Sequence, residues 1–291
     1  MSFNLPKSRY HFKAQPGYFV YTDPSIDNTE LPAIADNFGL AEGKTWKGLL
    51  DDIQAQNKRS GETGEVYKLI YAARHGEGHH NVAEAKYGTK AWDDHWSLLT
   101  GDGELIWGPD PSLTSVGEGQ ARDARRIWNN LLSEGAPDPP PLPGAYFSSP
   151  MIRSAKTLYL TFEGRTPAKP VVILESIRED FKDRHTCDER SKRSDVAAEW
   201  EPKGWIIDSK MEEEDTLFKS DYKETHETMA KRLADALSDI FERTEGIDVI
   251  NITSHSGVMQ ALFRAVDHDD FKPKTGGMVP LLIKGTRRSN K

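Results

Sequence analysis

The sequence has little cysteine and no long hydrophobic run. Cys187 is the one cysteine among 291 residues, so no disulfide can form within the chain, which favours a reducing compartment. No stretch approaches the roughly 18–20 apolar residues of a membrane span. The first twelve residues also lack the apolar core of a signal peptide. We therefore expect a cytoplasmic protein, without excluding the nucleus, and no membrane partner.

Two nucleotide-binding motifs are also missing. Neither the Gly-x-x-x-x-Gly-Lys-[Ser/Thr] loop nor the Rossmann glycine fingerprint occurs in the sequence. The sequence therefore does not indicate an enzyme that uses nucleoside triphosphates or dinucleotides. Positive charge is scarce, with 38 Lys and Arg against 46 Asp and Glu and a net charge of −8. Because an acidic surface repels nucleic acid, we expect no nucleic-acid partner. A small anionic substrate remains possible where Arg and His gather in one pocket.

Two stretches of the chain differ in composition from the rest. Residues 1–63 are rich in Pro, Gly, Asn and Asp with scattered aromatics, which predicts an N-terminal extension packed on a core. Residues 64–291 would form the core domain. Within it, residues 180–215 are highly charged and without clear periodicity, which predicts an irregular insert at this position. Loops of that length are often functional.

The core domain alternates between apolar runs of strand length and amphipathic runs of helix length. Residues 66–73 are apolar and rich in strand-forming residues, while Met229, Leu233 and Leu237 share one face of a helix. The alternation predicts an α/β fold, a three-layer α/β/α sandwich with a mostly parallel central sheet. The predicted strands are 66–73, 145–148, 170–174, 247–253 and 278–283, and the predicted helices are 45–53, 114–132, 151–162, 223–241 and 257–266.

Charged side chains follow four of these strands. In such sheets, ligands bind beyond the carboxyl ends of the strands, so we expect the side chains to meet at one rim. Arg74 and His75 follow the first strand, Arg153 the second, Glu179 the third and His255 the fourth.

This set of side chains suits phosphate chemistry. A guanidinium group binds two phosphate oxygens at once and keeps its charge. A neutral imidazole nitrogen is a competent nucleophile toward phosphorus, and neighbouring positive charge disfavours protonation of His75. A carboxylic acid such as Glu179 would protonate the leaving alcohol and then deprotonate the attacking water.

Four ordered segments of the chain carry a resemblance to a known family. The chain resembles the histidine phosphatase superfamily, in its phosphoglycerate mutase-like branch, from about residue 66 to residue 283. The longer form Arg-His-Gly-Glu-Gly-x-His-Asn and the stretch Thr-Cys-Asp-x-Arg-Ser at 186–191 are most similar to the fungal phosphomutase-like proteins. The segments are Arg74-His-Gly-Glu with Asn81, Asp110-Pro-Ser-Leu-Thr-Ser-Val-Gly117, Ser148-Ser-Pro with Arg153, and Ser254-His-Ser-Gly257.

The resemblance implies a role for each matching residue. It makes residues 64–291 a histidine phosphatase domain that acts on a small phosphorylated metabolite without a cofactor. His75 is then the nucleophile, His255 completes the catalytic pocket, and Glu179 in Ile-Arg-Glu is the acid and base. Asp180 lies next to Glu179 and remains an alternative. The phosphate-binding residues are Arg74, Asn81, Arg153 and Ser256.

The sequence gives little support for a metal-binding site. His79 and His80 are adjacent, and Cys187 is alone, which fits no closed zinc pattern. We therefore expect no metal. The segment from His185 to Arg190 either lines the substrate pocket or forms an ion-paired loop, and the sequence favours neither.

Four functions remain open on this fold, the last of which is a non-hydrolytic reaction such as a lyase step. The first is hydrolysis of small phosphate monoesters through a phosphohistidine on His75. The second is a phosphomutase of the phosphoglycerate mutase type, which must shield the phosphoenzyme from water. The third is a non-catalytic binding protein, which would have lost at least one catalytic group. The complete set of groups speaks against the third function, and residues 180–215 do not resemble the corresponding segment of the mutases, so hydrolysis is favoured over both.

Overall fold

The protein is built around one central sheet. The computed structural model describes residues 8–165, 169–180, 184–218 and 223–288. Within these residues the strand order is β1-β7-β2-β6-β3-β4-β5. The strands are β1 (Tyr10–Ala14), β2 (Glu65–Arg74), β3 (Ala145–Ser148), β4 (Val172–Ile173), β5 (Ile206–Ile207), β6 (Val249–Ser254) and β7 (Met278–Arg287).

Five neighbouring strands of the sheet run parallel to one another. β6 pairs with β2 and β3 in parallel register, and β4 pairs in the same sense with β3 and β5. β7 alone runs antiparallel to its neighbours β1 and β2. The predicted mostly parallel sheet is confirmed, and the carboxyl ends of β2, β3, β4 and β6 meet at one edge.

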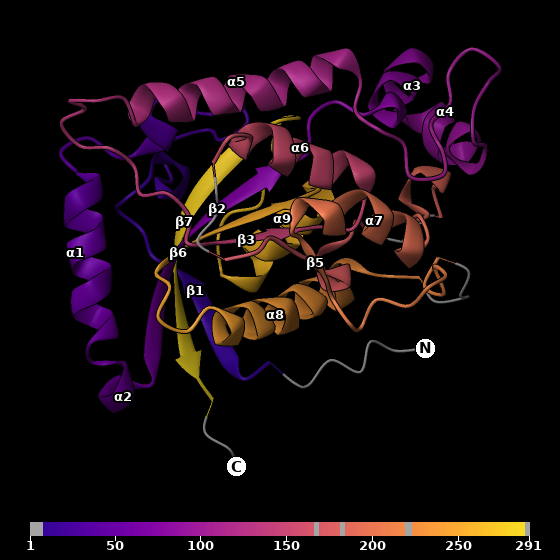
Figure 1. Ribbon diagram of the computed structural model, residues 1–291. Coiled ribbons are helices and arrows are strands. Elements are labelled where there is room, and N and C mark those ends of the chain that lie inside the picture. The colour runs from indigo at the N-terminus through magenta and orange to yellow at the C-terminus, as the bar shows by residue number, and fades with distance from the viewer. Residues whose placement is uncertain (1–7, 166–168, 181–183, 219–222, 289–291) are drawn as a thin grey trace.

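Helices cover both faces of the sheet, as Figure 1 shows for α5 on one side and α8 on the other. None of the helices in the described part of the chain is long and apolar enough to cross a bilayer. The helices are α1 (Trp46–Asn57), α2 (Ser60–Thr63), α3 (His79–Tyr87), α4 (Thr89–Asp94), α5 (Ser115–Leu131), α6 (Ile152–Phe162), α7 (Arg193–Trp200), α8 (His226–Arg243) and α9 (Ser256–Ala265).

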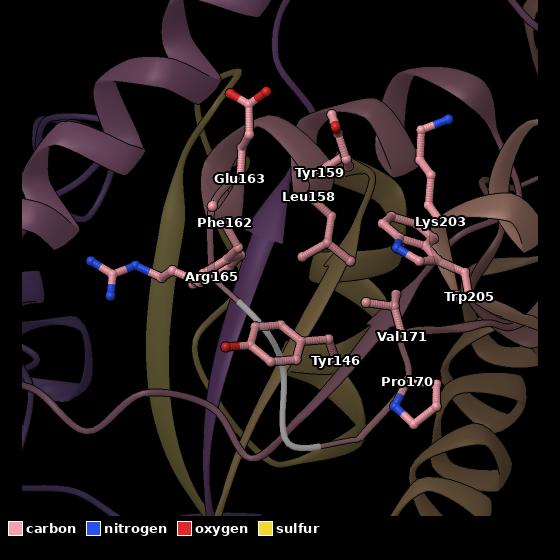
Figure 2. A pocket seen from close by; sticks show the side chains of 12 residues that line it. Tyr146, Leu158, Tyr159, Phe162, Glu163, Arg165, Pro170, Val171, Lys203 and Trp205 are labelled. Atoms are coloured by element: carbon pink, nitrogen blue, oxygen red, sulfur yellow. The ribbon is translucent and has the colours of Figure 1, made fainter.

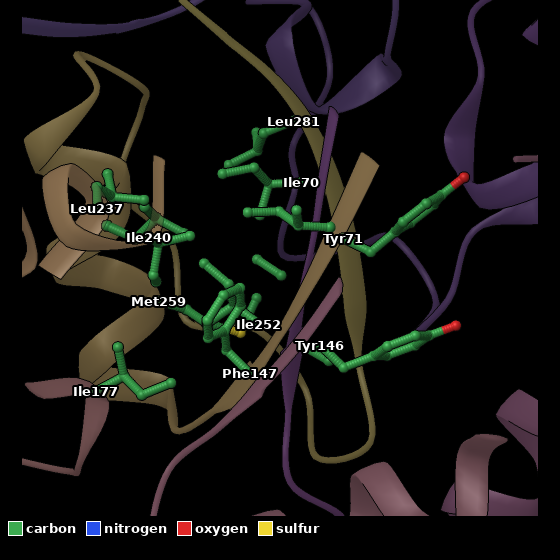
Figure 3. Packing of buried hydrophobic residues seen from close by; sticks show 14 of the residues in the cluster. Ile70, Tyr71, Tyr146, Phe147, Ile177, Leu237, Ile240, Ile252, Met259 and Leu281 are labelled. Atoms are coloured by element: carbon green, nitrogen blue, oxygen red, sulfur yellow. The ribbon is translucent and has the colours of Figure 1, made fainter. Parts of the chain in front are cut away.

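The alternation of side chains along β2 produces the layers. Ile70 points toward the α8 side chain Leu237, whereas the next residue, Tyr71, points to the opposite face (Figure 3). There its ring centroid lies 5.0 Å from that of Trp128 in α5. Because successive strand residues face opposite ways, one buried strand serves both cores. The predicted three-layer α/β/α sandwich is confirmed.

The N-terminal segment shares this core. β1 pairs with β7 at the edge of the sheet, and the Phe12 ring packs 4.9 Å from that of Phe241 in α8. Trp46 at the start of α1 is fully buried. The predicted boundary at residue 63 stays a prediction, and residues 1–7 of the predicted extension lie outside the described residues.

The segment 180–215 is more regular than predicted. It contains α7 and β5, and β5 extends the sheet beyond β4, so the expectation of an irregular insert was wrong there. The rings of Trp200 and Trp205 stack with centroids 4.4 Å apart. Because the segment is highly charged and its buried stretch is short, hydrophobic periodicity did not predict these elements. Residues 181–183 of the predicted insert lie outside the described residues.

Candidate active site

The predicted site residues gather at the carboxyl edge of the sheet. The backbone N–H of His75 donates to Ser254 O at 2.9 Å, which joins the ends of β2 and β6. Next to them lies a cavity of about 300 Å³. Six predicted site residues line it, namely Arg74, His75, Asn81, Arg153, Glu179 and Ser256.

His75 is buried and held in one tautomer. Its Nδ1 lies 2.7 Å from the backbone oxygen of Gly76. Because that oxygen can only accept, we assign the ring proton to Nδ1, which leaves the lone pair on Nε2. Burial, followed by the charges of Arg153 and Arg74, lowers the pKa of His75 well below its usual value. The side chain is therefore a neutral imidazole at the cavity wall.

Close backbone contact fixes the loop after β2. A β-carbon at Gly76 would lie 2.3 Å from Gly117 O, and one at Gly117 would lie 2.1 Å from Glu77 O. Only glycine fits at both positions, because the obstacle is backbone that cannot move aside. The Thr114 side chain accepts from Gly117 N at 3.1 Å and starts α5. The glycines of the two separate motifs thus meet in space.

Two buried arginines flank His75. Arg153 is fully buried, and its Nη1 and Nη2 donate to Cys187 O and Asp188 Oδ1 at 2.7 and 2.8 Å. Arg74 Nη1 donates to Pro273 O at 2.8 Å. The Nε atoms of both arginines have no partner among the described residues. Each guanidinium group is thus anchored from one side and keeps donor capacity for an anion.

Glu179 lies at the cavity wall, and its pKa is raised above the usual value for a carboxyl group. Burial, followed by the Asp180 and Asp188 carboxylates, raises the pKa of Glu179 to about 8. The backbone N–H of Asp180 donates to Glu179 Oε1 at 3.0 Å. A carboxyl group with this pKa can be protonated at neutral pH and still lose its proton readily. Both carboxyl groups line the cavity, and the raised pKa favours Glu179 as the acid.

His255 lies behind the cavity wall rather than in it. Its ring centroid is 5.1 Å from that of His75, and its Nε2 lies 2.7 Å from Ser149 Oγ. Its Nδ1 has no partner within the described part of the chain. Burial and the charge of Arg153 lower the pKa of His255 well below its usual value. Ser256 begins α9, whose first N–H groups are suited to an anion.

Asn81 has a structural contact that the sequence did not predict. Its Oδ1 accepts from Gly78 N at 2.9 Å, which closes the first turn of α3. This leaves the amide nitrogen for a ligand, and the phosphate contact predicted for Asn81 stays a prediction. The side chain is half-buried and lines the cavity.

His80 also lines the cavity, and sequence reasoning missed it. Its ring centroid lies 5.4 Å from that of His75, and its Nδ1 has no partner among the described residues. A β-carbon at Gly78 would come within 2.7 Å of that nitrogen. The Gly-x-His spacing at 78–80 was the available signal, since glycine makes room for the ring.

The segment from His185 to Arg190 both lines the cavity and forms ion pairs. His185, Cys187 and Asp188 are in the wall, while Arg190 Nε lies 3.0 Å from Glu175 Oε2. Donor atoms of His185, Cys187 and Asp188 lie within 4.8 Å of one another, a spacing that a metal ion could use. An ion there would have to share Asp188 with Arg153, whose positive charge opposes it.

A second hollow lies beside α6 and is different in character. It measures about 160 Å³ and is lined by Tyr146, Leu158 and Val171 among others. In Figure 2 the charged ends of Glu163 and Arg165 point away from its centre in different directions. Chemistry needs polar groups that converge, and the described residues provide them at the cavity beside His75.

Comparison with known proteins gives a consistent set of matches. The model of the histidine phosphatase superfamily (branch 1) matches residues 70–273. A probable phosphoglycerate mutase of Arthroderma benhamiae is 32% identical over 94% of this chain and 84% of its own length. A probable phosphoglycerate mutase of Saccharomyces cerevisiae is also 32% identical, over 94% and 95%. The solved structure of the alpha-ribazole phosphatase from Shigella flexneri is similar over 74% of this chain and 94% of its own, with 18% identity and a TM-score of 0.44.

Proposed function

The chain belongs to the histidine phosphatase superfamily, branch 1, and on that premise we propose that it hydrolyses small phosphate monoesters through a phosphohistidine on His75. The hydrogen bond between Nδ1 of His75 and Gly76 O carries the proposal. It leaves Nε2 as the nucleophilic nitrogen of a neutral ring at the cavity wall. The buried Arg74 and Arg153 beside it supply the positive charge that a phosphoryl group requires.

The first step transfers the phosphoryl group to the protein. Nε2 of His75 attacks phosphorus, the N–P bond forms, and the bond between phosphorus and the ester oxygen breaks. Protonated Glu179 gives its proton to that oxygen, so the alcohol leaves neutral. The pKa of about 8 makes this acid available at neutral pH.

The second step returns the protein to its starting state. Ionised Glu179 takes a proton from water, whose oxygen attacks phosphorus and breaks the N–P bond. Inorganic phosphate leaves, His75 is again neutral and Glu179 is again protonated. Arg74, Arg153 and the N-terminus of α9 bind the charge on the phosphoryl oxygens in both steps.

A phosphomutase is the second candidate function. The curated relatives named above as probable phosphoglycerate mutases favour it. A mutase uses the same first step but returns the phosphoryl group to another oxygen of the substrate. It must therefore keep water from the phosphoenzyme and is commonly primed by a bisphosphate.

One assay separates the two functions. Purified protein is incubated in excess chelator with para-nitrophenyl phosphate and a panel of phosphorylated metabolites, with and without 2,3-bisphosphoglycerate. We expect release of inorganic phosphate that needs neither metal nor bisphosphate. Conversion of 3-phosphoglycerate into its isomer without net phosphate release would establish the mutase instead. Loss of all phosphate release in chelator would contradict a metal-free route.

A further inference from the structure

The cavity has an outer part that the phosphate chemistry does not use. Beyond the cradle of Arg74, His75 and Arg153, one wall comes from α3 and α4 and supplies Glu84, Thr89, Trp92 and Asp93. Further side chains on the rest of the wall are Asp180, His185, His226, Gln260 and Lys272.

The charges of this outer part are mostly negative. Glu84 and Asp93 stand on the α3–α4 wall, and Lys272 is the one lysine among the described lining residues. The two arginines of the lining belong to the cradle beside His75. A second phosphate or a carboxylate on the substrate would need a cluster of arginine or lysine of its own. The described outer part provides one exposed lysine against three carboxylates, those of Glu84, Asp93 and Asp180.

The α3–α4 wall is also aromatic and held in place. The Trp92 ring lies 5.7 Å from that of Trp107 and 6.0 Å from that of His185, centroid to centroid. The carboxylate of Asp93 lies 3.7 Å from Nε2 of His185. Glu84 Oε1 accepts a hydrogen bond from Thr89 Oγ1 at 3.1 Å. An aromatic ring beside two carboxylates matches the way proteins bind an ammonium group.

We propose that the outer part of the cavity selects phosphate monoesters whose alcohol carries a positive charge, such as an amine or quaternary ammonium group. The proposal rests on the phosphatase function argued above. Asp93 and Glu84 attract the cation, and Trp92 forms the apolar part of the same wall. The same two carboxylates repel a substrate with a second anionic group, so the site discriminates by repulsion as well as by attraction.

A matched series of esters tests the proposal. The substrates are 2-aminoethyl, 2-hydroxyethyl and carboxymethyl phosphate, which share one short chain and differ in the charge at its end. At pH 7.5 and low ionic strength we expect kcat/KM to fall in that order, by about tenfold from the cationic to the anionic ester. Added salt should shrink the difference, because these charges are open to solvent.

Charge variants assign the effect to this wall. The double variant Glu84→Gln, Asp93→Asn should reduce the cationic-to-anionic ratio to about threefold or less. Lys272→Gln should raise the ratio, because it removes the balancing cation. Asp94→Asn is the matched control, since Asp94 neighbours Asp93 but pairs with Lys90 and does not line the cavity. It should leave the ratio unchanged.

The results of these assays distinguish failure of the charge selection from failure of the proposed phosphatase function. Equal kcat/KM for the three esters, or the reverse order, would overturn the charge selection. Turnover of para-nitrophenyl phosphate in the same experiment would still support the proposed phosphatase function. An order that persists in the double variant would also overturn it, because the wall would not be its cause. No turnover of any ester, para-nitrophenyl phosphate included, would overturn the proposed function and this inference together.

Discussion

Gly257 and Glu179 lie in such close contact that a β-carbon at position 257 would come within 2.5 Å of Glu179 Oε1. The same β-carbon would lie 3.2 Å from Asp180 Oδ2. The first turn of α9 therefore sets the place of the carboxyl group proposed as acid and base. Glycine is therefore required at the end of the Ser-His-Ser-Gly motif because a side chain there would collide with Glu179, a residue 78 positions earlier in the chain.

The variant Gly257→Ala should lower activity without lowering stability. The methyl group displaces the Glu179 carboxyl, so we expect kcat for alkyl esters to fall about tenfold to a hundredfold. Alanine in a helix favours folding by up to about 1 kcal/mol over glycine. Gly119→Ala in α5 is the control, since a β-carbon there meets nothing within 4 Å. Thermal melting beside steady-state kinetics checks both expectations, and unchanged kcat in Gly257→Ala would contradict the contact.

The acid role proposed for Glu179 predicts a specific pH profile. Because its proton must reach the leaving oxygen, kcat/KM for an alkyl ester should decline as the pH rises through about 8. Glu179→Gln should remove that limb and slow alkyl esters far more than para-nitrophenyl phosphate, whose phenolate needs little protonation. Glu163→Gln, a surface change at the partner of Arg125, should keep the wild-type profile. Equal losses with both classes of ester would speak against Glu179 as the acid.

The same raised pKa predicts how stability depends on pH. The folded chain holds the Glu179 proton more tightly than the unfolded chain, whose carboxyl titrates near 4.5. This contribution to the free energy of unfolding is present at low pH and is lost as the pH rises toward about 8. Glu179→Gln should therefore be less sensitive to pH between these values, as urea unfolding at several pH values would measure. An identical pH dependence in the two proteins would refute the shift.

The contacts of Arg153 predict that even the conservative change Arg153→Lys strongly lowers activity. Lysine cannot make the two anchoring bonds to Cys187 O and Asp188 Oδ1 and also bind phosphate with a planar group. We expect Arg153→Lys to lower kcat/KM by about a hundredfold or more. Arg122→Lys on the exposed side of α5 is the control and should leave kcat/KM unchanged. A loss below about threefold would exclude Arg153 from the phosphate site.

The strands and long helices of the core could be predicted from the sequence. β3 has the predicted bounds, and α5 begins after Thr114, at the start of the predicted helix 114–132, because the Thr114 hydroxyl accepts from Gly117 N. These elements carry their own signal in periodicity and capping. β1 and β5 were missed, since each is an edge strand whose partners lie far away in the chain.

The candidate site was predictable where a motif follows a strand. Arg74, His75 and Arg153 do so, and they meet at the cavity. Asp188 and Trp92 could not be placed, because nothing local says that their segments fold back over the sheet edge. The long-range bond from Arg153 to Asp188 brings one of them there.

The most direct measurement is detection of the phosphoenzyme. The protein is mixed with para-nitrophenyl phosphate in excess chelator, quenched in base within milliseconds, and digested for mass spectrometry at neutral or alkaline pH. We predict an acid-labile phosphoryl group on His75, formed and lost at rates consistent with kcat, and absent from His75→Ala, which should also release no phosphate above background. Phosphate release that continues in His75→Ala, or a phosphoryl group on another residue, would contradict the account.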